Sequence, residues 1–236
     1  MSTPEPPKRF YKEAGIFDDA AGFGVALDSR AVKTPLGADF RVPTRALGKA
    51  CALEWGAQGE RIQLTSMRLT QLAFASIDHT PRRRDELIAH TAKYGESDLV
   101  CHRADTPAAL AKRQSVAWDA LLEWSASAYA FAPPVVVGIV AAPVPPEMLA
   151  SLSAHFATLD DFRLTALAHT ANLAGSAVIA LALTAGRIDG ATAYAAATVD
   201  EIWSLETWGE DAEARARLTE RQQEFEATGR FVAALA

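Results

Sequence analysis

Residues 164–186, LTALAHTANLAGSAVIALALTAG, decide what kind of fold this chain adopts. At about 1.5 Å of rise per residue, a helix of this length could cross a bilayer. His169 and Asn172 oppose that placement, because polar side chains are expensive in hydrocarbon. The stretch therefore predicts a helix buried on most sides within a helical domain, and not an integral membrane protein. Gly175 and Ser176 would let a neighbouring helix approach it closely.

The composition is that of a folded globular protein. Half of the 236 residues are hydrophobic and 22% are charged. The net charge of −6 and a single short basic cluster, Arg82 to Arg84, argue against a nucleic-acid partner. Cys51 and Cys101 lie far apart without a CxxC pair, so neither a zinc site nor a disulfide framework is indicated.

The pattern of hydrophobic residues changes from mixed to helical near residue 70. Short strands with turn chemistry between them are indicated over 23–28, 31–35 and 40–43, which predicts an antiparallel meander. From Leu69 onward the periodicity is mostly helical. The sequence therefore predicts an α+β fold. A small N-terminal β-meander/α domain over 1–70 is followed by a larger, mostly α-helical domain over 71–236.

Several helix ends are marked by capping residues. Thr44 is a candidate N-cap for a helix that runs to Gln58, and Asp189 is another candidate for a later helix. Three helices are expected after residue 145, over 145–157, 160–185 and 189–206. The last pattern continues past Gly209 to about residue 228. The proline-rich segment 131–148 is expected to be a connector with one extra strand or an extended crossing.

The stretch EIWSLETWGEDAEARAR, residues 201–217, combines aromatic and acidic residues. As one helix it would align Trp203, Glu206, Glu210 and Glu213 in a single stripe. A solvated acidic face beside a core tryptophan is the commoner meaning of such a pattern. A binding face and an acid/base site are the alternatives.

Three further tryptophans, Trp55, Trp118 and Trp124, lie in charged, helical settings. Tryptophan usually belongs to the core, whereas exposed tryptophan beside carboxylates is typical of a protein-binding surface. The sequence lacks a complete dinucleotide fingerprint, a GxxxxGK[ST] loop and an HxxxH pair. No cofactor or metal is therefore expected, and the pattern favours recognition over catalysis.

An ordered set of short segments resembles the assembly chaperone family of the F-type ATP synthase, whose members bind the free alpha subunit. The segments are RFYK (9–12), LDSRAVKTP (27–35), EWGAQ (54–58), SMRLTQLAFASID (66–78), ESDLVCHRA (96–104), RQSVAWDALLEW (113–124), GSAVIALAL (175–183) and ETWGE (206–210). The resemblance covers most of the chain. It implies the same two-part fold, no catalytic activity and no cofactor.

The resemblance also implies a functionally important glutamate in the helix that contains ETWGE. Glu206 and Glu210 are the first candidates and Glu201 the third, with Trp208 between the first two. The chain departs from the family pattern at Ser204, at residues 214–216 and at Arg68, so the shape of the acidic face is its own.

The expected mechanism is competitive binding to the alpha subunit. An unassembled subunit exposes a partly apolar surface for the beta subunit, and such surfaces aggregate. Tryptophans could cover the apolar part while the glutamates bind basic groups. The runner-up is a hydrolase-like enzyme with Glu206 and a histidine in a pocket between the domains, and a third possibility is a homo-oligomeric structural protein. We expect the free chain to be a monomer. The N-terminal segment resembles no secretory signal or presequence, which favours the bacterial cytoplasm.

Overall fold

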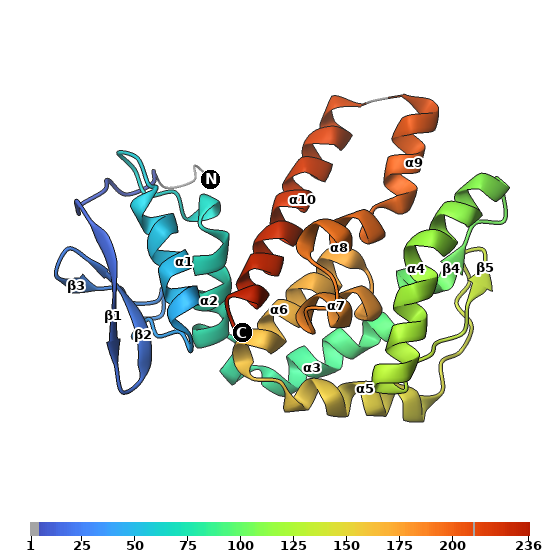
Figure 1. The fold of residues 1–236 in the computed structure, drawn as a ribbon, viewed down its shortest axis with the longest axis horizontal. Helices are drawn as coiled ribbons and strands as arrows, with labels where there is room; N and C mark the ends of the chain where they lie inside the picture. Colours follow the sequence, from blue (N-terminus) through green and yellow to red (C-terminus); the bar gives the residue numbers. More distant parts are fainter. Residues whose placement is uncertain (1–4, 210) are drawn as a thin grey trace.

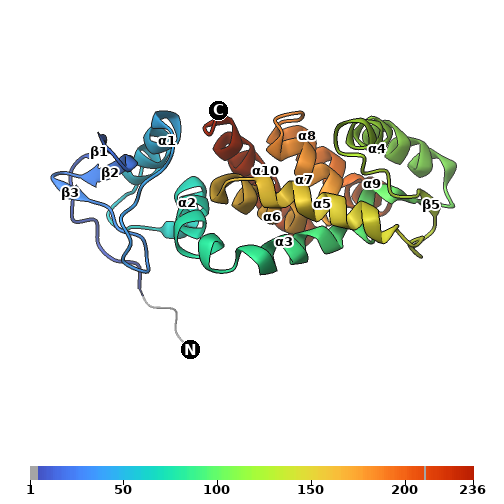
Figure 2. The same cartoon turned by 90° about the horizontal axis from the view of Figure 1, so that it is seen from below.

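The computed structural model describes residues 5–209 and 211–236, and it confirms the predicted α+β class (Figure 1). A small sheet and helix α1 (Arg45–Gly56) form one end of an elongated molecule. Helix α4 (Ala108–Tyr129) and the short strands β4 (His102–Arg103) and β5 (Val136–Val137) form the other end, as Figure 2 also shows.

The N-terminal sheet has three antiparallel strands in the order β1-β2-β3, with bounds β1 (Ala14–Asp19), β2 (Gly22–Leu27) and β3 (Arg30–Ala31). The predicted strand over 31–35 is shorter than expected, and 40–43 contributes only a bridge from Val42 to Phe23. Gly22 begins β2 at φ +126°, and only glycine fits there, because a Cβ would lie 2.8 Å from the Val42 carbonyl oxygen.

Helix α1 begins where the sequence predicted. The Thr44 hydroxyl accepts a hydrogen bond from the Leu47 amide at 3.1 Å, which satisfies one of the free donors at the helix N-terminus. The same hydroxyl donates to the carbonyl of Ala234 near the end of the chain. The first helix of the N-terminal region is therefore joined directly to the C-terminus.

Two hydrophobic cores lie beneath these elements. The smaller core is built from the sheet, α1 and α2 (Arg68–Asp78), but it also contains C-terminal side chains: Ala166, Ala227, Phe231, Val232 and Leu235. Phe231 stacks on Phe162 with their ring centroids 6.3 Å apart. The last helix of the chain thus completes the N-terminal core, and the division at residue 70 stays a prediction.

The larger core belongs to the helices that follow α2. Their bounds are α3 (Arg84–Ala92), α5 (Pro146–Thr158), α6 (Asp161–Ala174), α7 (Ala177–Thr184), α8 (Gly190–Ala197), α9 (Val199–Trp208) and α10 (Ala212–Ala233). Four short 3-10 turns, at 64–66, 80–82, 93–95 and 99–101, connect elements in the first half of the chain. The proline-rich connector supplies β5, which pairs in parallel with β4.

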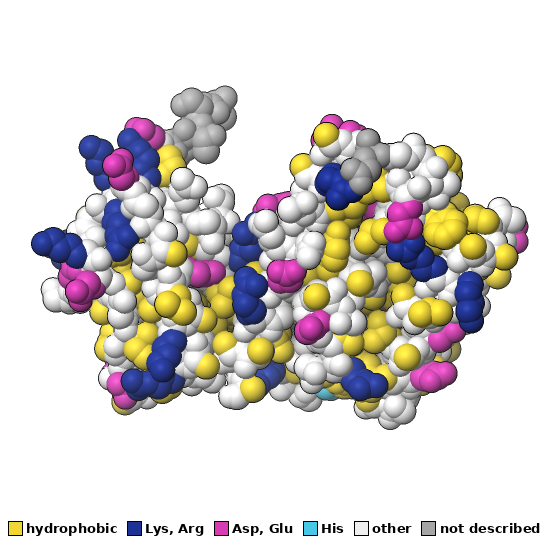
Figure 3. Space-filling view, turned by 45° about the horizontal axis from the view of Figure 1, so that its top comes forward, with side chains coloured by type: hydrophobic (Ala, Val, Ile, Leu, Met, Phe, Trp, Pro, Cys, Tyr) yellow, Lys and Arg dark blue, Asp and Glu magenta, His cyan; other side chains and the backbone are white. Residues whose placement is uncertain are grey.

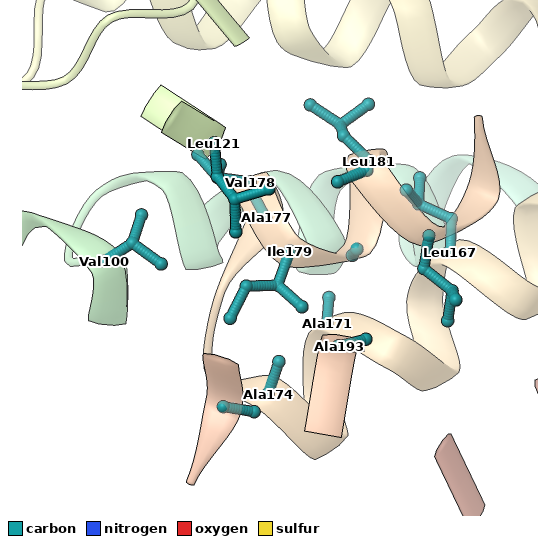
Figure 4. Packing of buried hydrophobic residues seen from close by; sticks show 14 of the residues in the cluster. Val100, Leu121, Leu167, Ala171, Ala174, Ala177, Val178, Ile179, Leu181 and Ala193 are labelled. Carbon is teal, nitrogen blue, oxygen red and sulfur yellow. The ribbon is translucent and has the colours of Figure 1, made fainter. Parts of the chain in front are cut away.

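The stretch at 164–186 is buried as predicted, but it forms two helices. Gly175 adopts φ +65° and ends α6, and the Ser176 hydroxyl then accepts from the Ile179 amide at 3.0 Å to begin α7. Every residue of α7 is buried. Figure 4 shows Ile179 lying close to Ala171 and Ala174 of α6 in the interior. In the described part of the chain, no helix combines the length and apolarity needed to span a membrane.

The close helix approach predicted at Gly175 occurs elsewhere. Beyond Gly175 itself, its chain neighbours and the backbone of its own helix, no atom lies within 4 Å of its Cβ position. Helices α8 and α10 instead meet at Gly190 and Gly229, where a Cβ on Gly190 would lie 2.3 Å from the Phe225 carbonyl oxygen. The Asp189 side chain caps α8 by accepting from the Thr192 amide at 2.8 Å, as predicted.

Candidate partner-binding arm

Helix α9 and the N-terminal half of α10 project together from the rest of the molecule, and we call this pair the arm (Figure 1). The single helix expected from 189 onward is broken twice. Thr198 separates α8 from α9, and Gly209, at φ +97°, ends α9. Asp211 then caps α10 by accepting from the Glu213 amide at 3.1 Å.

These breaks overturn the continuous stripe predicted over 203–213. Trp203 and Glu206 lie on α9, whereas Glu213 lies on α10 and pairs with Arg217 at 2.8 Å. Glu210 lies outside the described residues. Gly209, at φ +97° between the helices, is the physical reason, because the regular rotation of about 100° per residue stops there.

Arg113 on α4 forms an ion pair with Glu206 on α9. Its Nη1 donates to Oε2 at 2.5 Å and its Nη2 donates to Oε1 at 3.2 Å. These charged hydrogen bonds lower the pKa of Glu206 below its ordinary value. Glu206 is therefore ionised at neutral pH and paired in the free chain.

Two other polar contacts hold the first turn of α9. Asp200 accepts from the Gln114 side-chain amide at 2.8 Å, and Glu201 accepts from Arg221 at 2.7 Å. Val199 is the one residue of α9 that is buried. Residues 202–205 are half-buried, so α9 is attached by these polar contacts together with partly buried side chains, and Glu201 is engaged within the arm itself.

The tryptophans divide into core and surface groups. Trp118 is fully buried, and its indole nitrogen donates to the Ala196 carbonyl at 2.8 Å. Trp55 is also buried and packs edge-on against Tyr11. Both were predicted as partner-binding candidates, and the structure corrects this because their rings lie in the two cores, out of a partner's reach.

The remaining three tryptophans are at least partly exposed, and one of them, Trp203, is half-buried on α9. Trp124 is half-buried and packs edge-on against Tyr129 with ring centroids 5.2 Å apart. Trp208 is 79% exposed, two residues from Glu206 on the arm. The structure thus places an exposed aromatic ring and an ionised acid two residues apart on α9, where the helical rotation of about 100° per residue points them in different directions. Figure 3 shows a notch between the arm and the N-terminal lobe, with charges of both signs along its walls.

Sequence reasoning missed two features of the surface. Arg113 lies within the quoted segment 113–124 but received no role, since nothing local marks it as the partner of a residue 93 positions away. The second feature is the connector, where four apolar side chains are 50–94% exposed: Val135, Val137, Ile139 and Val140. Its β-branched run was a visible signal, although it predicted one extra strand or an extended crossing and not an exposed apolar surface.

The Glu/His enzyme site proposed as the runner-up is not assembled around Glu206. A groove of about 510 Å³ between α2, α3 and α6 carries three histidines: His79, His90 and His169. The glutamate lining that groove is Glu86, which pairs with Arg83 at 2.6 Å, whereas Glu206 pairs with Arg113. Over residues 5–209 and 211–236, no group of three potential ligands could hold a metal ion.

Both cysteines are buried free thiols. Burial raises the pKa of Cys51 and that of Cys101 to about 12. Thiolate chemistry at neutral pH is thereby suppressed at both positions.

A two-part α+β fold that projects an ionised glutamate and an exposed tryptophan on a helical arm has the features of a protein-binding chaperone. The chain belongs to the ATP12 chaperone protein family, whose model matches residues 8–126. This confirms the resemblance to the assembly chaperones of the F-type ATP synthase.

Three solved structures are similar over nearly the whole chain. Atp12 from Paracoccus denitrificans is 37% identical, with a TM-score of 0.90 over 97% of this chain and 98% of that one. An aspartate-to-lysine mutant of the same protein is 36% identical over the same shares, with the same TM-score. A candidate chaperone from Agrobacterium tumefaciens is 32% identical, with a TM-score of 0.90 over 98% of this chain and 87% of that one.

Proposed function

We propose that this chain binds the unassembled alpha subunit of the F-type ATP synthase in the bacterial cytoplasm. It covers the surface of alpha that faces beta until the beta subunit displaces it. The observation that carries the proposal is that the projecting arm presents both an exposed Trp208 and an ionised Glu206 at the end of α9. Membership of the ATP12 family supports the class of client, an ATP synthase subunit.

The arm offers the two kinds of contact that the exposed subunit surface requires. A tryptophan ring supplies a large apolar area at little conformational cost, and such residues dominate binding energy at protein interfaces. An ionised carboxylate supplies specificity, because it rejects partners that lack a basic group at the matching position. Glu210, between Trp208 and α10 in sequence, is a second candidate acid.

Competitive release needs no nucleotide or catalytic step. Beta binds the same surface of alpha in the assembled enzyme, so mass action displaces the chaperone once beta is present. The free chain would be monomeric under this proposal.

The test is co-expression with the alpha subunit from the same organism, followed by size-exclusion chromatography. We expect a soluble complex of one chaperone with one alpha subunit, which beta disrupts when it is added. Beta co-expressed alone with the chaperone is the specificity control, and it should give no complex. Failure to retain alpha in solution would refute the proposal.

Two substitutions locate the surface. Trp208→Ala and Glu206→Gln should each weaken capture of alpha while leaving the chaperone folded, because both side chains are exposed. Asp18→Asn is the matched control, since it removes one exposed acid from β1 at the opposite end of the molecule. If the Trp208 and Glu206 variants capture alpha as well as the control does, the binding surface lies elsewhere.

A further inference from the structure

Glu206 is already occupied in the free chain. The guanidinium of Arg113 donates hydrogen bonds to both carboxylate oxygens of Glu206, at 2.5 and 3.2 Å. Two-point contact of this kind is how an arginine on another protein would bind the same carboxylate. The residue proposed to bind the partner therefore faces an internal competitor.

The pair is suited to exchange because it is open to water. The side chains of Arg113 and Glu206 are 38% and 55% exposed. Exposed ion pairs are weak, since solvent and salt screen the attraction and two long side chains must be held still. A guanidinium that approaches Glu206 within a dry interface gains more, because the lower dielectric strengthens the same contact.

Helix α9 does not depend on this pair to stay in place. Its first turn is held by the Gln114–Asp200 hydrogen bond at 2.8 Å, the Glu201–Arg221 ion pair at 2.7 Å and the buried Val199. Glu206 lies beyond that turn, toward the exposed end of the helix at Trp208 and Gly209. Release of Arg113 therefore frees the carboxylate while the base of the arm remains attached.

We propose that Arg113 is an internal stand-in for an arginine of the client, and that client binding exchanges one guanidinium for the other at Glu206. This inference rests on the proposed function, and it adds the chemistry of the contact: the client presents an arginine to α9. Until then, Arg113 shields the acid from weaker basic ligands. Arg113 also lowers the affinity for the client, because the Arg113–Glu206 ion pair must break before the client's arginine can bind Glu206.

The experiment is a competition for the alpha subunit. Wild-type chaperone and one variant, carrying different tags, are co-expressed in equal amounts with alpha, and the ratio of the two in the purified complex is measured by mass spectrometry. Because exposed pairs are weak, we expect Arg113→Gln to be enriched over wild type by roughly two- to fivefold. The enrichment should fall toward one when alpha is captured at about 1 M salt, where the Debye length is about 3 Å.

Matched variants separate exchange from a general effect of charge. Lys112→Gln removes a neighbouring exposed cation of α4, and its ratio should stay near one. Arg113→Lys keeps the positive charge but cannot form the bidentate contact, so its enrichment ratio should lie between those of wild type and Arg113→Gln. In a Glu206→Gln background, Arg113→Gln should give no enrichment, because there is no carboxylate left to release.

Failure of the inference is distinguishable from failure of the proposed function. If Glu206→Gln is depleted and Arg113→Gln is not enriched, the exchange is overturned. Depletion of Arg113→Gln in that case would make Arg113 a positioning residue for α9, and a ratio of one would leave it without a role in capture. If Glu206→Gln competes equally with wild type, the acid does not contact alpha at all, and both the exchange and the assigned role of Glu206 fall.

Discussion

The crossing of α8 and α10 at two glycines supports a specific prediction about stability, because α10 carries the arm. In Gly190→Ala the new methyl carbon would lie 2.3 Å from the Phe225 carbonyl oxygen and 2.6 Å from the Glu226 Cα. Both obstacles are main-chain atoms, so no side-chain rotation can make room. The helices would have to separate by about 1 Å to restore a contact of about 3.5 Å.

The cost of that separation follows from known core substitutions. Overpacking a core typically destabilises by about 1–3 kcal/mol, and the rigid obstacles at Gly190 place it at the upper end, about 3 kcal/mol. For a chain of this size, about 3 kcal/mol corresponds to a melting temperature lower by about 6–12 °C. Urea unfolding followed by circular dichroism would measure the first quantity, and calorimetry the second.

Gly56→Ala is the matched control. Gly56 is the last residue of α1, and no atom beyond its chain neighbours and its own helix backbone lies within 4 Å of its Cβ position. Alanine there should be neutral or stabilising by up to about 1 kcal/mol, because it reduces the freedom of the unfolded chain. If Gly190→Ala unfolds at the same urea concentration as Gly56→Ala, the two helices do not meet at Gly190 and the reasoning is refuted.

Three further predictions concern buried and half-buried groups. Burial raises the pKa of Asp98 to about 6, above its usual 3.8, so its contribution to stability is complete at low pH and is lost as pH rises through 6. The free energy of unfolding of wild type minus that of Asp98→Asn should therefore fall by roughly 1–3 kcal/mol between about pH 4 and about pH 7, as measured by urea unfolding. The hydrogen bond with His169 and, after it, the one from Arg68 at 2.7 Å lower the pKa of Glu224. Arg68→Ala should therefore destabilise by about 1–2 kcal/mol at neutral pH and by less as Glu224 becomes protonated in acid. An effect that grows in acid would contradict this. Trp118→Phe loses a buried hydrogen bond and should lower the free energy of unfolding by about 2–3 kcal/mol. Trp208→Phe, at an exposed position, should change it by less than about 0.5 kcal/mol. Equal effects of the two substitutions in urea unfolding would show that burial does not distinguish these tryptophans.

Features that depend on near neighbours in sequence were predictable. The caps at Thr44 and Asp189 are side-chain contacts within three residues, and both are confirmed. The burial of 164–186 follows from its composition, and the change to helical periodicity near residue 70 follows from spacing alone. The family resemblance also depended on short ordered segments, and the family match confirms it.

Helix breaks were predicted less well, for a physical reason. Gly175 and Gly209 stand within patterns that continue on both sides, and a glycine is tolerated inside a helix at a cost of about 1 kcal/mol. Periodicity therefore could not tell a tolerated glycine from one that turns the chain. The positive φ angles at both positions, +65° and +97°, end the helices where the packing of the flanking helices requires the chain to change direction.

The sequence by itself determined the α+β class, the buried helical interior, the capped helix starts and the chaperone family. Only the tertiary structure decided that Trp55 and Trp118 are core residues while Trp208 is exposed, that α10 completes the N-terminal core, and that Arg113 holds Glu206. The first group of properties arises from interactions within a turn or two of the chain. The second depends on contacts between distant segments, 93 positions apart for Arg113 and Glu206, and these exist only once the helices have packed.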